Sequence, residues 1–401
     1  MPAIKAFVKP ELLAWARERA KVKIDDAAKA VNVSPERIEQ WETGADAPTV
    51  NQLRGLAKKY HFPLAVFYLP EPPVDFAPLR DFRRLPNFED GTISPNLAFH
   101  IRNAHERREV ALELNDELSD EPQTFALKTA LKDDPEDVGQ KIRDFLGIED
   151  EAQKKAAQAG RAFDFWRRKM EEHDILVFVV SGPHYSVELQ EMRGFAIAKP
   201  RLPVIVVNGK DYSQGGRAFT LLHELTHILL GESAISNGSA DNLNDTAEEQ
   251  RIERFCDAVA AAALMPRRLL LSFPNVEKSS IRRWNDDELR KIAQAIGVSR
   301  HALLLRLVTI KRATWDYYKT QRARFDEEAR NAAEKAAQQP KKTVAIPRPT
   351  LVMSQNGRGY TRLVFRGYYE QRITLNDVSN YLGAKVKYIP DLERAAFRMT
   401  E

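Results

Sequence analysis

The segment HELTH at residues 223–227 has the residue types and spacing of a catalytic metal site. His223 and His227 are four residues apart, so on a helix both imidazoles leave the same face and can bind one ion. Glu224 follows the first histidine and would lie beside the coordination position that is left open for water. The pattern predicts an ion that activates water, with Glu224 as the general base.

Such a site needs a third protein ligand, and the histidines of this chain do not supply one nearby. Metzincins carry Gly and His where this chain has Leu230 and Ser233, so that class is excluded. The next histidine, His301, lies 74 residues after His227. A carboxylate is therefore expected to complete a His2Glu set, with Zn²⁺ as the default ion and Mn²⁺ or Fe²⁺ as alternatives.

The helix predicted after the polar segment 231–245 offers several carboxylates. Its apolar stripe includes Ile252, Phe255 and Val259, and both Glu249 and Glu253 lie within or beside that stripe at 100° per residue. A carboxylate that faces a core needs a partner, and a metal ion is one. The spacing leaves both residues open as ligands; the other carboxylates of this helix are Glu248 and Asp257.

Short β-branched runs at 175–180, 194–198 and 203–207 predict the strands of a small sheet next to this helix. Helical patterns cover 95–172 and resume at about 214, continuing past 335. The expected fold class is therefore α+β. Residues 341–401 predict a small tail domain, with a strand-like LVF at 363–365, and point to no chemistry.

The first 69 residues read as short helices with tight turns, and residues 28–57 carry the pattern of a helix-turn-helix. Asn32 can take the left-handed turn conformation, and Ser34 can cap the helix that follows. That helix, over about 34–43, would enter a major groove. Ser34, Arg37 and Gln40 are its candidates for contact with base edges.

The charge of this segment opposes DNA binding. Between Ser34 and Asp46 there is one basic residue, Arg37, and the local net charge is −3; the acidic residues are Glu36, Glu39, Glu42 and Asp46. Phosphates would be repelled by such a surface. Two interpretations stay open: DNA binding, or a fold retained for dimerisation or for docking a partner.

The helix-turn-helix segment resembles the XRE (Cro/repressor-like) family, most specifically at Trp41, Glu42, Gly44 and Pro48. Residues 193–230 together with 249–266 resemble the ImmA/IrrE family of metallo-endopeptidases, in the strand, in H-E-x-x-H and in the later E-x-F-C-x-x-V-A motif. The order of the segments is similar to fused XRE and ImmA/IrrE proteins.

That resemblance implies a zincin-like metallopeptidase domain, with Glu253 as the third metal ligand beside His223 and His227. Asp257 stands where Asn is usual, which bears on hydrogen bonding around the ligands rather than on ligation. By family analogy the protein substrate is a transcriptional repressor or an antitoxin.

The composition excludes several classes of protein. Of 401 residues, 43% are hydrophobic and 29% charged, which is too apolar for general disorder and too charged for an integral membrane protein. The single cysteine, Cys256, cannot form an intramolecular disulfide, and the first ten residues lack the apolar core of a signal peptide. We expect a cytoplasmic location without a membrane partner.

These patterns predict five segments: a helix-turn-helix domain (1–69), a Pro-rich linker (70–94), the metallopeptidase domain (95–280), a helical extension with a further helix-turn-helix-like unit (281–340) and the tail (341–401). The predicted function is a zinc-dependent endopeptidase that cleaves a repressor or antitoxin. DNA is a possible partner and a homodimer is left open. The alternative is a DNA-binding regulator or antitoxin whose metal site is structural or sensory. An intact Glu224 favours the enzyme, since a structural site needs no base there.

Overall fold

The computed structural model describes residues 5–72, 80–81, 93–182, 185–211, 213–232, 234–236, 247–278, 281, 283–338 and 346–398. The chain divides into two compact units. Residues 1–78, 85–106 and 183–187 form the first unit, and residues 79–84, 107–182 and 188–401 form the second.

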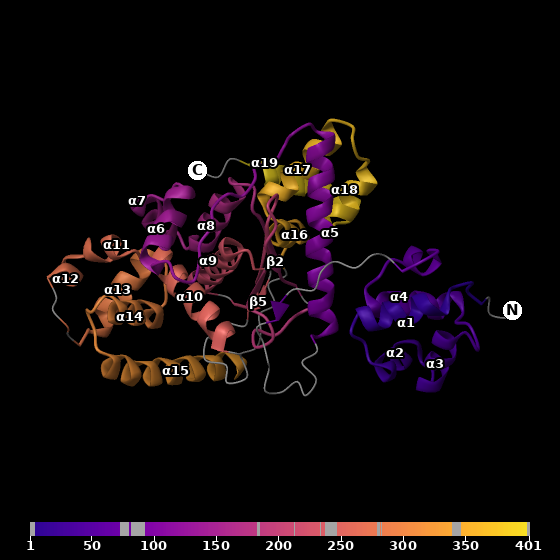
Figure 1. Cartoon of the computed structure of the whole chain (residues 1–401), viewed down its shortest axis with the longest axis horizontal. Helices are drawn as coiled ribbons and strands as arrows, with labels where there is room; N and C mark the ends of the chain where they lie inside the picture. Colours follow the sequence, from indigo (N-terminus) through magenta and orange to yellow (C-terminus); the bar gives the residue numbers. More distant parts are fainter. Residues whose placement is uncertain are drawn as a thin grey trace. The chain divides into compact units, whose positions relative to one another are not determined.

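The first unit is helical (Figure 1). Its elements pack around the buried side chains of Trp41, Tyr60 and Phe67. They are α1 (Pro10–Arg19), α2 (Ile24–Val31), α3 (Pro35–Thr43), α4 (Val50–Tyr60) and the 3-10 turn η1 (Leu64–Tyr68). The first half of α5 (Pro95–Glu117) is also assigned to this unit. Asn32 ends α2 with a φ of 54°, so the predicted left-handed turn between α2 and α3 is present.

The second unit is built on a five-stranded mixed sheet with the strand order β1-β5-β3-β4-β2. β2 runs parallel to β4, and β3 runs antiparallel to both β4 and β5. The strands are β1 (Arg80–Asp81), β2 (Leu176–Val180), β3 (Gly194–Ile197), β4 (Val204–Asn208) and β5 (Ala234–Ser236). The three predicted strands are therefore confirmed within a residue or two. Strands β1 and β5 are too short to show a strand pattern in the sequence.

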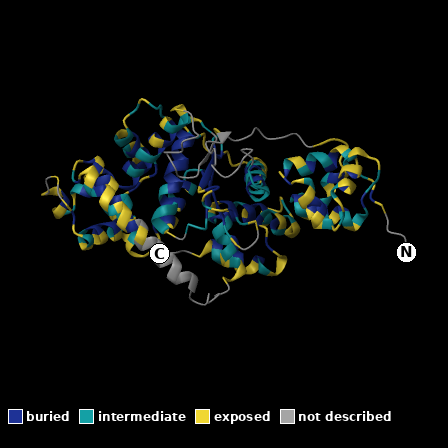
Figure 2. Cartoon of the chain, turned by 90° about the horizontal axis from the view of Figure 1, so that it is seen from below, coloured by how far each residue is buried: buried dark blue, intermediate teal, exposed yellow. Residues whose placement is uncertain are grey.

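Helices cover this sheet and explain why its three longer strands are apolar without alternation. Every residue of β2, β3 and β4 is buried (Figure 2). Helix α9 (Gln214–Leu230) packs on β3 and β4, while α8 (Ala162–Glu171) and α16 (Arg348–Asn356) pack on β2. Helix α10 (Ala247–Leu264) then packs on α9 and on α6 (Pro135–Phe145).

The remaining helices of this unit follow one another along the chain. They are α7 (Asp150–Gln158), α11 (Arg267–Leu271), α12 (Pro274–Glu277), α13 (Asp286–Ile296), α14 (Arg300–Thr309) and α15 (Trp315–Gln338). The tail adds α17 (Arg358–Tyr369), α18 (Leu375–Leu382), η2 (Val386–Tyr388) and α19 (Ile389–Phe397). The LVF segment at 363–365, predicted to be strand-like, lies inside α17, because its neighbours complete an amphipathic helix.

Buried side chains hold the C-terminal end of α10 in place. The Arg143 guanidinium donates to the carbonyl of Ala263 at 2.8 Å, and the Gln153 amide donates to that of Leu264 at 2.9 Å. The Arg306 guanidinium donates to the next carbonyl, that of Met265, at 2.9 Å. Carbonyls in the last turn of a helix lack partners within it, so these three contacts satisfy groups that burial would otherwise penalise.

The crossing of α6 over α10 depends on a glycine. A Cβ atom on Gly139 would lie 2.7 Å from the backbone nitrogen of Ala263 and 2.8 Å from the Cβ of Ala262. Backbone atoms cannot move aside as a flexible side chain can. The close approach therefore fixes how α10 lies against the rest of the unit.

We predict that Gly139→Ala lowers the free energy of unfolding by roughly 1–3 kcal/mol, because the added methyl group overpacks the crossing. Thermal and urea unfolding of the full chain would measure it. Gly359→Ala is the matched control, since its Cβ would meet only side-chain atoms of Glu171 at 3.4 Å or more. That control should be neutral or slightly stabilising. Equal effects of the two changes would contradict the prediction.

Candidate functional site

Helix α9 carries the H-E-x-x-H segment, and its residues 220–229 are all buried. It begins at Ser213, whose hydroxyl accepts from the backbone N–H of Gly216 at 3.0 Å, and it ends at Gly231, which has a φ of 76°. His223 is 3% exposed and His227 and Glu224 are 0% exposed. A polar group at such a depth must be paired, so the surroundings of these three side chains matter.

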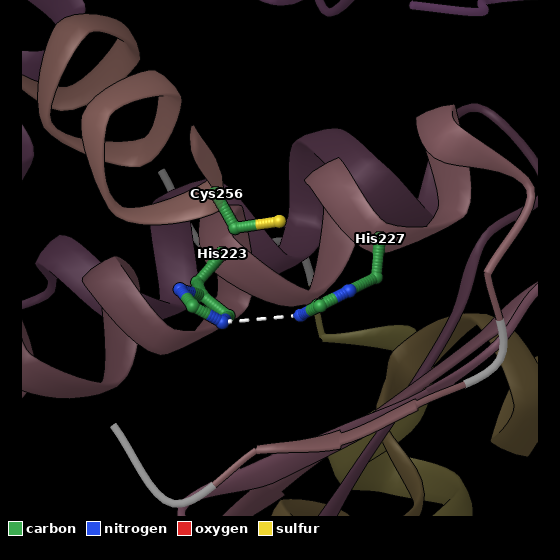
Figure 3. Close-up of side chains that lie close together, drawn as sticks. All are labelled: His223, His227 and Cys256. Carbon is green, nitrogen blue, oxygen red and sulfur yellow. Dashed lines mark hydrogen bonds between the residues drawn. The ribbon is translucent and has the colours of Figure 1, made fainter. Parts of the chain in front are cut away.

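The two histidines meet a carboxylate from the neighbouring helix. The Nε2 atoms of His223 and His227 are 3.2 Å apart, as the dashed line in Figure 3 marks. Glu253 on α10 places one carboxylate oxygen 3.3 Å from His223 Nε2 and the other 3.2 Å from His227 Nε2. Two imidazole nitrogens from α9 and both carboxylate oxygens of one α10 residue thus lie close together.

These spacings fit a tetrahedral ion. Ligand atoms bound at about 2.0–2.1 Å to such an ion lie about 3.3–3.4 Å from one another. The two imidazole nitrogens are 3.2 Å apart, and each lies 3.2–3.3 Å from a different oxygen of Glu253. The imidazoles are therefore spaced like two ligands of a small cation, and the carboxylate lies next to both.

Asp257 orients one of the imidazoles. Its Oδ1 atom lies 2.9 Å from Nδ1 of His223 and can accept the proton that this nitrogen carries. The Nε2 lone pair of His223 then points toward the convergence point, which is the tautomer a metal ligand needs.

The charges around the site favour the ionised forms of His223 and Glu253. Burial opposes a charge on His223, but the Glu253 carboxylate and the hydrogen bond to Asp257 raise the pKa of His223 well above its usual value. Burial would likewise raise the pKa of Glu253, yet His223 and His227 hold it well below the usual range. A metal ion bound between the histidines and Glu253 would take the place of the proton on Nε2 of His223.

Glu224 lies between α9 and the sheet. A Cβ atom on Gly194 of β3 would come within 2.7 Å of the Glu224 Oε1 atom and 2.7 Å of Thr220 Cγ2, so only a glycine lets the strand pass this close. Glu224 also contributes to the raised pKa of Cys256. The base candidate therefore lies near the α10 residues that face the histidines. Gly194 was not identified as important from the sequence. Its position at the start of the GFAI strand is the only feature of the sequence that draws attention to it.

Cys256 is a further group near the histidines. One ligand atom each from His223, His227 and Cys256 lies within 4.8 Å of the others. The thiol is buried in a small apolar cluster with Ile252, Leu131 and Leu230. Burial, followed by the charge of Glu253, raises the pKa of Cys256 well above its usual value. These surroundings favour a neutral thiol.

The structure separates the two carboxylates that periodicity left open. Glu253 is 3% exposed and faces the histidines, whereas Glu249, one turn earlier on α10, is only half-buried. The sequence could not separate them, because both lie beside the apolar stripe and differ only in how α10 crosses α9.

In the first unit, the three residues expected at a DNA surface are all exposed. Ser34 is the N-cap residue of α3, but its side chain makes no capping bond to the backbone; a hydrogen bond from its hydroxyl lowers the pKa of Glu36. Arg37 is half exposed and forms an ion pair with Asp46 at 2.5 Å. Gln40 is exposed on α3.

Ion pairs neutralise part of the negative charge that we counted on this surface from the sequence. The Arg17 guanidinium donates to both oxygens of Glu42, at 2.7 and 2.9 Å. Asp46 is paired with Lys5 as well as with Arg37. Of the four acidic residues counted there, the carboxylates that stay exposed without a cation among the described residues are Glu36 and Glu39. The local charge of −3 therefore overstates the repulsion of a phosphate.

The fold and the site define a metallopeptidase-like domain joined to a helix-turn-helix domain. Residues 170–308 match the family model of the IrrE N-terminal-like domain, a peptidase family, and residues 11–67 match that of a helix-turn-helix domain. The predicted fusion of these two modules is thereby confirmed. Comparison with curated proteins and with solved structures gave no significant match. Among the described residues, no helix is long and apolar enough to cross a membrane.

We predict that purified protein binds about one divalent ion per chain and that Glu253→Ala loses it, because two histidines alone leave the coordination incomplete. Glu249→Ala and Cys256→Ala should keep the ion. Elemental analysis after dialysis against a buffer without metal would measure the content. The ion content should fall as the pH is lowered, since protons compete for His223, whose pKa is raised. Loss in Glu249→Ala with retention in Glu253→Ala would refute the assignment.

Proposed function

We propose that this chain is a zinc-dependent endopeptidase that cleaves a protein substrate, and that the substrate is a transcriptional repressor or an antitoxin. The observation that carries the proposal is the buried cluster of His223, His227 and Glu253, in which the two imidazole nitrogens are 3.2 Å apart and each lies 3.2–3.3 Å from an oxygen of Glu253. The sequence context H-E-x-x-H and the match to a peptidase family support it.

In this proposal His223, His227 and Glu253 hold the ion, and Mn²⁺ or Fe²⁺ would fit the same donors. A bound zinc ion would supply Lewis acidity, both to the scissile carbonyl and to a water molecule. Glu224 would take a proton from the attacking water and pass it to the nitrogen of the leaving amine. Asp257 would keep the His223 ring in place throughout, through its contact with Nδ1.

The buried position of the site would strengthen these effects. His223, Glu224, His227 and Glu253 are each at most 3% exposed. Electrostatic interactions are stronger where bulk water is excluded, so the carboxylate of Glu224 would be a better base here than on a surface. The helix-turn-helix domain would bring the peptidase to DNA or to a DNA-bound substrate.

A second candidate is a regulator with a structural or sensory metal site. Structural zinc sites have four protein ligands and no open position, and the proximity of Cys256 to both histidines would allow it to be the fourth. The apolar surroundings of the thiol and the carboxylates beside it oppose a thiolate there. The peptidase is therefore the better supported function.

We predict that Glu224→Gln leaves the metal content and the melting temperature nearly unchanged but slows cleavage by roughly 10²- to 10⁴-fold, because the amide cannot accept the proton. The assay is to co-express the chain with a candidate repressor or antitoxin and to follow the length of that candidate substrate on a gel. His223→Ala, which loses the ion, is the inactive reference.

Two results would count against the peptidase. Cleavage by Glu224→Gln at the wild-type rate would exclude Glu224 as the base. Loss of regulation in Cys256→Ala together with an unaffected Glu224→Gln would instead favour the structural or sensory site.

A further inference from the structure

The general-base candidate Glu224 is closed to a peptide in this structure. Its side chain is 0% exposed, and those of His223, His227 and Glu253 are at most 3% exposed. A general base must lie within hydrogen-bond reach of the water that attacks the substrate, so the scissile peptide has to come close to Glu224. One of the elements around Glu224 must therefore move before a peptide bond can enter.

Strand β3 indicates where that peptide has to lie. A Cβ atom on Gly194 would be 2.7 Å from Glu224 Oε1, so the backbone of β3 passes beside the carboxylate. Gly194 pairs on one side with Val207 of β4 and on the other with Ser236 of β5. Neighbouring strands of a sheet lie about 4.7–4.9 Å apart, so a strand in either position runs close to Glu224.

Of the two neighbours of β3, β5 is the more weakly held. Strand β4 pairs with β2 over five residue pairs and with β3 over four, and all its residues are buried. Strand β5 has three residues and pairs with β3 over two. Helix α10 is fixed by its close approach to Gly139 and by the hydrogen bond from Arg143. Displacing β5 therefore breaks the fewest backbone contacts.

Strand β5 already has the form of a bound peptide. It is extended and runs antiparallel to β3, with Ser236 opposite Gly194. Peptide recognition by strand addition uses the same backbone hydrogen bonds along the side of a strand. Because β5 begins four residues after the end of α9, its short connection keeps it at a high effective concentration. An extended segment of a substrate would have to compete with it.

A second short strand covers the outer side of β5. Strand β1 pairs in parallel with β5, with Arg80 opposite Ala234. It lies in the segment 70–94 that was predicted as a linker, and it belongs to the second unit. Both sides of β3 at Gly194 are thus paired, and β5 is itself paired on both sides. A peptide that extends the sheet beside Gly194 can enter only by replacing β5.

We propose that β5 is a built-in occupant of the substrate site, and that an extended, unfolded segment of a protein substrate binds by replacing β5 as the antiparallel neighbour of β3. This inference deepens the proposed function and rests on it for the identity of the ligand. Folded domains are excluded, because their segments do not offer a free strand backbone. The structure then shows the closed form, in which the contact of β5 with β3 opposes binding.

The test uses the full chain with Glu224→Gln, which cleaves too slowly to consume its ligand, and fluorescein-labelled α-casein as an unfolded probe. Ile235→Pro removes the N–H of the residue that pairs with Phe195, so it loosens β5. Fluorescence anisotropy should show casein binding at least about tenfold tighter, since apparent affinity follows the fraction of chains whose site is open. With Glu224 intact, Ile235→Pro should speed casein cleavage by a similar factor.

Leu375→Pro is the matched control. It places a proline at the first residue of α18, a position that tolerates one, and should behave like the wild type. Thermal unfolding checks that each variant is folded. Hydrogen exchange gives a second measurement that needs no proline: saturating casein should speed amide exchange in β5 of the Glu224→Gln chain, while β3 stays protected.

The outcomes separate this inference from the peptidase activity itself. Unchanged casein affinity in a folded Ile235→Pro variant, or amide exchange in β5 that casein leaves unchanged or slows, would overturn the proposal. Tighter binding without cleavage by any chain that keeps Glu224 would support the occupied site and count against the peptidase. Cleavage by the wild type that Ile235→Pro does not speed would support the peptidase and refute the occupied site.

Discussion

The contact of the Glu253 carboxylate with the imidazoles of His223 and His227 is the interaction on which the rest of the second unit depends. All three side chains are almost completely buried. Removing one partner of such a buried pair leaves an uncompensated charge and costs roughly 3–5 kcal/mol. Glu253 and the histidines come from different helices, so the pair stays satisfied only while α9 and α10 keep their crossing. The site and the stability of the domain therefore depend on the same geometry.

The surrounding structure limits the movement of each helix. Gly139 lets α6 approach the backbone of α10, and Arg143 holds its last turn. Burial lowers the pKa of Arg143 to about 10, with Asp150 opposing the shift, so the guanidinium stays charged at neutral pH and suits the carbonyl end of the helix. On the other side, Gly194 lets β3 run against Glu224. Small residues at close approaches and cations at helix ends thus position the chemistry from outside the site.

The sequence predicted what depends on short-range periodicity. His223 and His227 share a helix face because of their spacing, and the three long apolar runs form strands because both faces of the sheet are covered. It could not choose between Glu249 and Glu253 from the residues alone, since that choice depends on the crossing of two helices. Glu42 and Asp46 were counted as free charges from the sequence, because their partners Arg17 and Lys5 are distant along the chain.

The turns before α3 and α14 have the same form, a residue at positive φ followed by an apolar residue and an extended N-cap residue, and they show why a recurrent turn does not define a function. The turn fixes the angle between two helices, and a buried residue six positions later fixes the face that the second helix turns inward. The chemistry of the exposed face of the second helix is determined by the other residues of that helix. Three leucines of α14 lie in the main core, whereas the exposed face of α3 carries Glu36 and Glu39. Affinity for a polyanion depends on these charges, so units with the same turn differ in whether they can bind DNA.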